Sequence, residues 1–245
     1  MCKEVGPVQV LAAFQEAINR LQLRPPLLQR SVKPVVVVAI DQLIGLAHGR
    51  ESPLPWLMAN GVGAADLAGI VVNTRHYRRE SMVDVAVYRG ETDPYATLAT
   101  AESEAYCDHG VSSASTSDTT DYLWDLYKLL QVPSPIRLFV ARVRTLERCC
   151  VLEGRIEFLV KGYRGALREG DRVFSIVLPT AKHDYGSIQC SGWEHGRDAM
   201  MSLPAAVWAE PSLLTVAQRT EVPGLIVDTR LQPHRDKSSN TGNAW

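Results

Sequence analysis

Residues 82–104, MVDVAVYRGETDPYATLATAESE, decide how the rest of the chain is interpreted. Val83, Val85 and Val87 recur at every second position, which is the period of a β-strand. The segment 90–94, GETDP, has the composition of a turn. A second extended run covers residues 97–104. We therefore expect two short strands joined by a turn and paired as a hairpin.

Three acidic side chains are expected at one end of this hairpin. Glu102 and Glu104 share a face because they lie two residues apart, about 7 Å along the strand. Asp84 reaches the same patch if the strands pair. Converging carboxylates repel one another unless they are protonated, solvated or neutralised by a cation. A hard divalent ion such as Mg²⁺ is the usual neutraliser, because it takes oxygen ligands and keeps positions for water and phosphate.

The composition is that of an ordinary globular protein of 245 residues, with 46% hydrophobic and 22% charged residues. The net charge of −1 argues against a polycation that coats nucleic acid, although a local basic groove remains compatible with it. The five cysteines show no Cys-x-x-Cys pair and no zinc spacing. The first ten residues lack signal-peptide order and no apolar run has transmembrane length. We expect a cytoplasmic protein without a membrane contact.

The segments around the hairpin alternate between the two kinds of secondary structure. Helical periodicity is found at 7–22, 119–131 and 146–164. Strand patterns are found at 67–72, 136–143, 173–178 and 188–193. Residues 34–46 fit either a buried strand or a helix, and 199–220 predict one more helix. The alternation indicates an α/β fold with a sheet that is at least partly parallel.

The remaining segments are interpreted as loops, one domain and a tail. Residues 49–64 predict a loop and 109–118 a mobile loop or lid. A single domain is expected over residues 1–220, and the polar segment 221–245 is expected to be a largely flexible tail. Tryptophans along the chain, including Trp124, are assigned to the core or an interface rather than to base stacking.

A basic cluster, Thr74 to Glu80, immediately precedes the hairpin. It contains Arg75, Arg78 and Arg79. One interpretation is a solvated turn. The other is a phosphate-binding patch beside the carboxylates, since phosphate contacts supply most of the affinity for nucleic acids.

The order of motifs resembles the restriction-endonuclease-like nucleases, the PD-(D/E)xK superfamily. Asp84 is followed by Glu102-Ser103-Glu104, by a helix bearing DLYKLL (125–130) and by a strand with PIRLFV (135–140). The resemblance covers about residues 65–180. The family usually has Asp at one strand and Glu-x-Lys or Asp-x-Lys on the next. Here Glu104 replaces the lysine and no proline precedes Asp84. Some members use Glu-x-Glu or carry the lysine on the following helix, which points to Lys128.

The resemblance implies a mixed central sheet flanked by helices and a nuclease core within about 65–180. It implies metal-dependent hydrolysis of DNA phosphodiester bonds, in restriction, repair or defence, and a homodimer. Mg²⁺, with Mn²⁺ as a substitute, would be bound by Asp84, Glu102 and Glu104, and Lys128 would stabilise the developing charge. DNA phosphates would contact the three arginines Arg75, Arg78 and Arg79.

Two alternatives stay open from the sequence. The chain is either an active nuclease or a catalytically inactive interaction or regulatory protein with the same fold. Lys128 either serves the acidic site or forms a helix-surface pair with Asp125 or Asp121.

Overall fold

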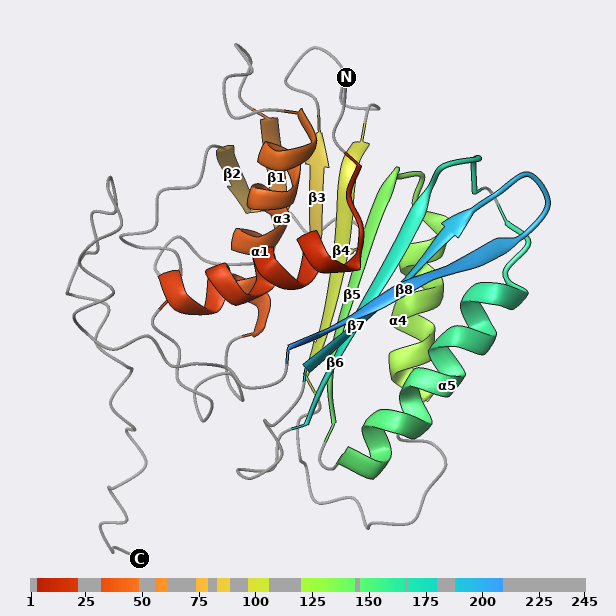
Figure 1. Ribbon diagram of the computed structural model, residues 1–245. Helices are drawn as coiled ribbons and strands as arrows, with labels where there is room; N and C mark the ends of the chain where they lie inside the picture. Colours follow the sequence, from red (N-terminus) through yellow and green to blue (C-terminus); the bar gives the residue numbers. More distant parts are fainter. Residues whose placement is uncertain are drawn as a thin grey trace, which may run out of the picture.

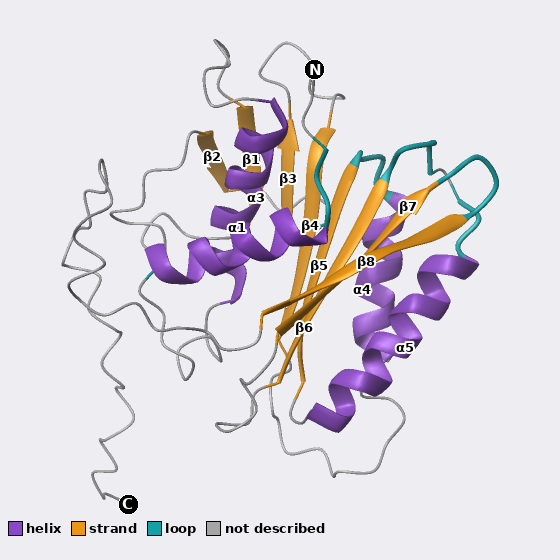
Figure 2. Ribbon diagram, in the orientation of Figure 1, coloured by secondary structure: helices purple, strands orange, loops and turns teal. Residues whose placement is uncertain are grey.

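A computed structural model describes residues 4–21, 32–48, 56–60, 74–78, 83–88, 97–105, 120–143, 146–165, 167–179 and 188–208. Figure 1 shows the chain and Figure 2 its secondary structure. The elements follow in the order α1 (Pro7–Arg20), α3 (Val32–His48), β1 (Trp56–Asn60), β2 (Thr74–Arg78), β3 (Val85–Tyr88), β4 (Thr97–Ala105), α4 (Thr120–Gln131), β5 (Ile136–Val143), α5 (Leu146–Gly162), β6 (Arg172–Pro179), β7 (Ile188–His195) and β8 (Met200–Trp208).

The eight described strands form one mixed sheet in the order β2-β1-β3-β4-β5-β6-β7-β8. Strands β4, β5 and β6 are parallel and are connected through α4 and α5. Strand β3 runs antiparallel to both β1 and β4, and β7 runs antiparallel to β6 and β8. This confirms an α/β fold with a partly parallel sheet.

The sheet lies between two layers of helix. Helices α1 and α3 cover one face, and α4 and α5 cover the other (Figures 1 and 2). Along β5 all eight residues are buried, and alternate side chains join the hydrophobic clusters on opposite faces. A central parallel strand covered on both faces reads as a continuous apolar run, which explains the sequence of this segment.

The ambiguous segment 34–46 belongs to the helix α3. Almost every residue of this helix is buried, including the polar Asp41 and Gln42. A helix buried around most of its circumference shows no amphipathic stripe, so its periodicity cannot distinguish it from a buried strand.

The expected hairpin is present. β3 pairs with β4 antiparallel, with Val85 opposite Ala101 and Val87 opposite Ala99. A register shift follows between Val87 and Tyr88. Helices α1, α4 and α5 and strands β5, β6 and β7 match the segments predicted for them to within two residues.

Three predictions of secondary structure were wrong. Residues 200–208 form the strand β8 rather than a helix, because they pair with β7 at the margin of the described sheet. Such an edge position tolerates Pro204, which has no N–H to donate. Residues 56–60, expected in a loop, form β1, and residues 74–78, for which a turn was one interpretation, form β2. The predicted strand 67–72, the predicted loop or lid 109–118 and the tail 221–245 lie outside the described residues.

No helix among the described residues is long and apolar enough to cross a membrane.

Arg137, on β5, is fully buried. Its guanidinium donates hydrogen bonds to the carbonyl oxygens of Val132 and Ser134 and lies 3.1 Å from Asp171 Oδ2. The same carboxylate oxygen accepts from the backbone N–H of Arg168 at 3.1 Å. Burial lowers the pKa of Arg137, and Asp171 opposes this shift. The pair ties the turn before β6 to the segment between α4 and β5.

We expect Asp171→Ala to lower the free energy of unfolding by about 3–5 kcal/mol, because the change leaves a buried guanidinium without its counter-charge. Urea unfolding followed by circular dichroism measures this. The matched control is Glu157→Ala, which breaks an ion pair to Lys161 whose side chains are about half exposed, and which we expect to cost about 1 kcal/mol or less. Equal costs for the two variants would contradict the role of the buried pair.

Candidate functional site

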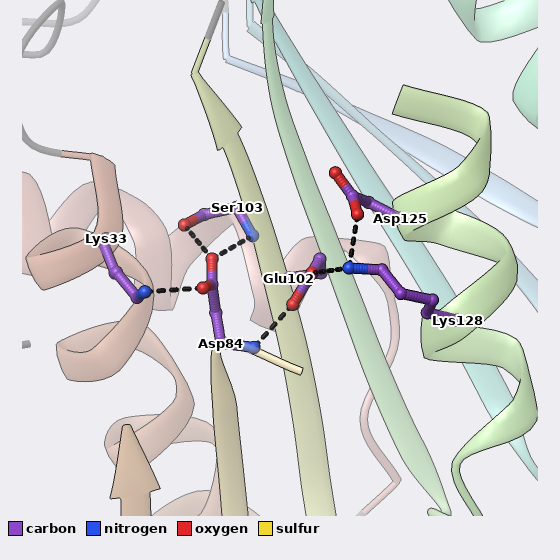
Figure 3. A network of polar contacts seen from close by, with 6 residues as sticks. All are labelled: Lys33, Asp84, Glu102, Ser103, Asp125 and Lys128. Atoms are coloured by element: carbon purple, nitrogen blue, oxygen red, sulfur yellow. Dashed lines mark hydrogen bonds and ion pairs between the residues drawn. The ribbon is translucent and has the colours of Figure 1, made fainter. Parts of the chain in front are cut away.

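Asp84 and Glu102 are held together at the end of the β3–β4 pair. Asp84 directly precedes β3, so the register places it opposite Glu102 on β4. The Asp84 N–H donates to Glu102 Oε2 at 2.5 Å. In return, the N–H and Oγ–H of Ser103 donate to Asp84 Oδ2 at 3.0 and 2.9 Å (Figure 3). Each carboxylate is thus fixed by the backbone of the neighbouring strand.

Two lysines approach this pair from helices on opposite faces of the sheet. Lys33 of α3 places Nζ 2.6 Å from Asp84 Oδ1. Lys128 of α4 places Nζ 3.2 Å from Glu102 Oε1 and 2.5 Å from Asp125 Oδ1 (Figure 3). The prediction that Lys128 lies beside the acidic site is therefore confirmed, and so is its pairing with Asp125. Lys128 thus contacts both Glu102 and Asp125, and its role at the acidic site stays a prediction.

Helix α4 is anchored so that Lys128 faces the sheet. Leu126, Leu129 and Leu130 are fully buried in the cluster between α4, α5 and the sheet. The hydroxyl of Tyr122 donates to the carbonyl oxygen of Arg142 on β5 at 2.5 Å. These contacts fix the rotation of the helix, and Lys128 lies at the border between its buried and exposed sides.

The charges in this network do not cancel. Asp84, Glu102 and Asp125 supply three carboxylates, whereas Lys33 and Lys128 supply two ammonium groups. Burial of Glu102, followed by the charge of Asp84, raises the pKa of Glu102 to about 7, although the Asp84 N–H and Lys128 act in the opposite direction. Burial disfavours the charged form of Lys128, but its bonds to Asp125 and Glu102 outweigh this and raise its pKa. The site therefore carries one acid that exchanges its proton near neutral pH.

Glu104 lies two residues beyond Glu102 on β4, so strand alternation directs it to the same face of the sheet. Across the described part of the chain, no three or more His, Cys, Asp or Glu side chains are grouped so that they could hold a metal ion. The expected trio is thus not assembled as a three-ligand set there, and only Asp84 and Glu102 are brought together. Metal binding by Glu104 stays a prediction.

The predicted basic residues lie toward the margin of the sheet. Arg75 and Arg78 belong to β2, whose side chains the structure does not describe, and Arg79 lies outside the described residues. The pairing registers place Arg78 opposite Asn60, and Asn60 opposite Val85. Arg78 is therefore level with the acidic end of the hairpin, two strand spacings from β3, or about 10 Å of backbone.

A magnesium ion at this site would be held by Asp84, Glu102 or both, since Mg²⁺ is commonly bound by one or two carboxylates, with water completing its octahedron. The two residues are linked through the Asp84 N–H, whereas their carboxylates have separate partners, with Lys33 at Asp84 and Lys128 at Glu102. In this structure Lys33 contacts Asp84 Oδ1 and Lys128 contacts Glu102 Oε1. Burial, followed by the charge of Asp84, raises the pKa of Glu102. Binding of the ion thus requires at least one ammonium group to move.

Three members of the network were not assigned to the site from the sequence. Lys33 lies about 50 residues before Asp84, and nothing in the local pattern links the two. Ser103 stands between the two predicted ligands, but its side chain points to the other face of β4. Asp125 was predicted to pair with Lys128 on the helix surface, but this pair was not connected with the acidic site.

The chain matches no protein-family model, no curated protein and no solved structure.

The pKa of Glu102 gives a pH dependence of stability with a definite sign. The group titrates near 7 in the folded protein and near 4.5 when unperturbed. Between these values the folded chain holds a proton that the unfolded chain has lost, so stability falls as the pH rises through this range. We expect the free energy of unfolding, relative to Glu102→Gln, to fall by about 3 kcal/mol between about pH 5 and 8.

Urea unfolding of both proteins at each pH measures this difference. Glu157→Gln is the matched control, because its carboxylate is about half exposed and lies on α5, away from the network. A relative stability that rises with pH would contradict the assignment.

Proposed function

We propose that this chain is a metal-dependent nuclease with a restriction-endonuclease-like fold. The single observation that carries the proposal is the network joining Asp84, Glu102 and Lys128. These three residues come from the start of β3, from β4 and from α4. They are also three of the residues that the motif resemblance assigns to the active site, including a lysine displaced to the helix.

The order of elements supports the same proposal. The acidic hairpin β3–β4 is followed by α4 and then by β5, which is parallel to β4. The family pattern has the same sequence of two acidic strands, a helix and a strand. Asp84, Glu102 and Lys128 therefore follow the order of the family pattern along the chain, and they contact one another in the structure.

Each residue has a role in phosphodiester hydrolysis. Asp84 and Glu102 would hold Mg²⁺, which when bound neutralises charge on the scissile phosphate and activates water. Lys128 donates to a phosphoryl oxygen as negative charge develops there. Glu104 orients the attacking water. Ser103 keeps the Asp84 carboxylate in place through its N–H and hydroxyl.

The substrate and setting follow from the same proposal. DNA is the expected substrate, with its phosphates contacting Arg75, Arg78 and Arg79. Arg78 is aligned across the strands with the acidic end of the hairpin. This alignment favours a DNA duplex or single strand that crosses this end of the sheet. A cytoplasmic homodimer is expected, because many nucleases of this family that cut both strands act as dimers.

A second candidate is an inactive protein of the same fold with an interaction or regulatory role. One observation favours it. All four carboxylate oxygens of Asp84 and Glu102 already have protein donors, so the network is closed without a metal ion. The response of the protein to divalent ions separates the two candidates.

We expect cleavage of plasmid or linear DNA in the presence of Mg²⁺ or Mn²⁺, and a loss of about 100-fold or more in Asp84→Asn and in Glu102→Gln. Both substitutions remove a charge with little change in shape. Agarose-gel and fluorescent cleavage assays, with an RNA substrate alongside, measure the rates. Glu157→Gln, on the outer side of α5, is expected to cleave like the wild type.

If the wild-type protein showed no metal-dependent cleavage of DNA or RNA, the proposed nuclease activity would be refuted. Full activity in Glu102→Gln would refute the assigned site even if the protein cleaves.

We also expect Lys33→Met to tighten Mn²⁺ binding by about tenfold or more, because it removes the ammonium group that competes for Asp84 Oδ1. Isothermal titration calorimetry gives the affinity, and thermal shifts with Mn²⁺, Mg²⁺ and Ca²⁺ provide an independent readout. Lys161→Met removes a lysine from an exposed ion pair on α5 and serves as the control. Unchanged or weaker Mn²⁺ binding in Lys33→Met would show that the ion does not bind at Asp84.

A further inference from the structure

Three aromatic rings form a continuous cluster on the outer side of the α4–α5 layer. Trp124 and Tyr127 stack with their centroids 5.9 Å apart and their planes at 27°. Tyr127 meets Tyr163 edge to face at 6.0 Å. Trp124 is 61% exposed and Tyr127 37% exposed. Of the two locations predicted for Trp124, the core is therefore wrong, and the interface stays a prediction because the large ring faces solvent.

The third ring is held in place by the backbone that follows α5. Gly165 passes so close to Tyr163 that a Cβ at this position would collide with its hydroxyl and ring. Tyr163 is also partly buried against the cluster beneath α4 and α5. Gly165 thus leaves the space that the Tyr163 ring occupies when it makes its edge-to-face contact with Tyr127.

The ring cluster is contiguous with the acidic site. Trp124 and Lys128 are four residues apart on α4, so they lie one above the other on the same side of the helix. The Lys128 side chain extends toward the sheet, where its Nζ contacts Glu102 Oε1. A chain that lies on the rings can therefore reach Lys128 without leaving this side of α4.

Positive charge borders the rings. Arg164 follows Tyr163 directly, and within the described part of the chain its side chain contacts only the carbonyl oxygens of Lys161 and Tyr163. The Arg164 guanidinium has no carboxylate partner among the described residues. This charge suits a polyanion better than an apolar protein surface.

We propose that the Trp124–Tyr127–Tyr163 cluster, with Arg164 beside Tyr163, is a stacking surface for single-stranded nucleic acid. Exposed aromatic faces bind bases of any sequence, and neighbouring arginines bind the phosphates between them. The proposal deepens the nuclease assignment, on which it rests for its biological meaning. It names the form of substrate delivered to Lys128, namely an unpaired strand.

The test measures binding separately from cleavage. Fluorescence anisotropy of a labelled oligothymidylate of about 20 nucleotides is followed in EDTA, with the matching duplex as competitor. We expect Trp124→Ala to raise the Kd by about 5- to 150-fold, the range for losing one stacked base. Trp124→Phe should recover most of the affinity. Phe158→Ala is the matched control, because Phe158 is 83% exposed on α5 but belongs to no ring pair.

The outcomes divide clearly. Weakened binding in Trp124→Ala and near-wild-type binding in Phe158→Ala support the stacking surface. No binding of the oligonucleotide by the wild type, equal binding by all variants, or preference for the duplex overturns it. A dimer that dissociates in Trp124→Ala, seen by analytical ultracentrifugation without any change in oligonucleotide binding, would assign the rings to self-association instead.

The nuclease proposal and the stacking-surface proposal can be refuted independently of each other. Oligonucleotide binding is measured in EDTA, where metal-dependent cleavage does not occur, so it is tested separately from the acidic site. Binding without cleavage therefore refutes the enzyme while leaving the stacking surface intact, and cleavage without ring-dependent binding does the reverse.

Discussion

The crossed hydrogen bonds between Asp84 and the strand β4 are the constraint on which the site depends. The Asp84 N–H binds Glu102, while Asp84 Oδ2 accepts from Ser103. Because both bonds use backbone N–H groups, they exist in one pairing register only. A slip of one residue would break both and turn Glu102 to the other face of the sheet. The position of every other member of the network follows from this register.

The sheet is covered on both faces at this point, and each face contributes one lysine. Lys33 comes with α3 and Lys128 with α4, and each neutralises the carboxylate that is nearer to it. Asp125 then adds a third negative charge on the α4 side. Such a site is stable only as a whole, because removing either lysine would leave a carboxylate with little access to water. Burial of Glu102, followed by the charge of Asp84, makes this carboxyl group hold its proton up to about pH 7.

Much of the architecture could be predicted because the local patterns were strong. The β3–β4 hairpin and helices α4 and α5 have clear periodicity. Strand β8 was mistaken for a helix, since an edge strand buries few residues and its alternation is weak. Lys33 could not be predicted as a member of the site. Its place there arises from packing between α3 and the sheet, and no short-range pattern encodes such a contact.

Helix α4 carries both an exposed aromatic residue and a lysine of the acidic site. On one side of this helix Lys128 contacts Glu102, and Trp124, one turn earlier, is exposed to solvent. One helical turn separates the two side chains, so any change in the rotation of α4 moves both together. The buried leucines and the Tyr122–Arg142 bond oppose such a rotation. If a nucleic-acid strand stacks on the rings as proposed, it would be held in fixed relation to Lys128, which is the condition that catalysis by positioning requires.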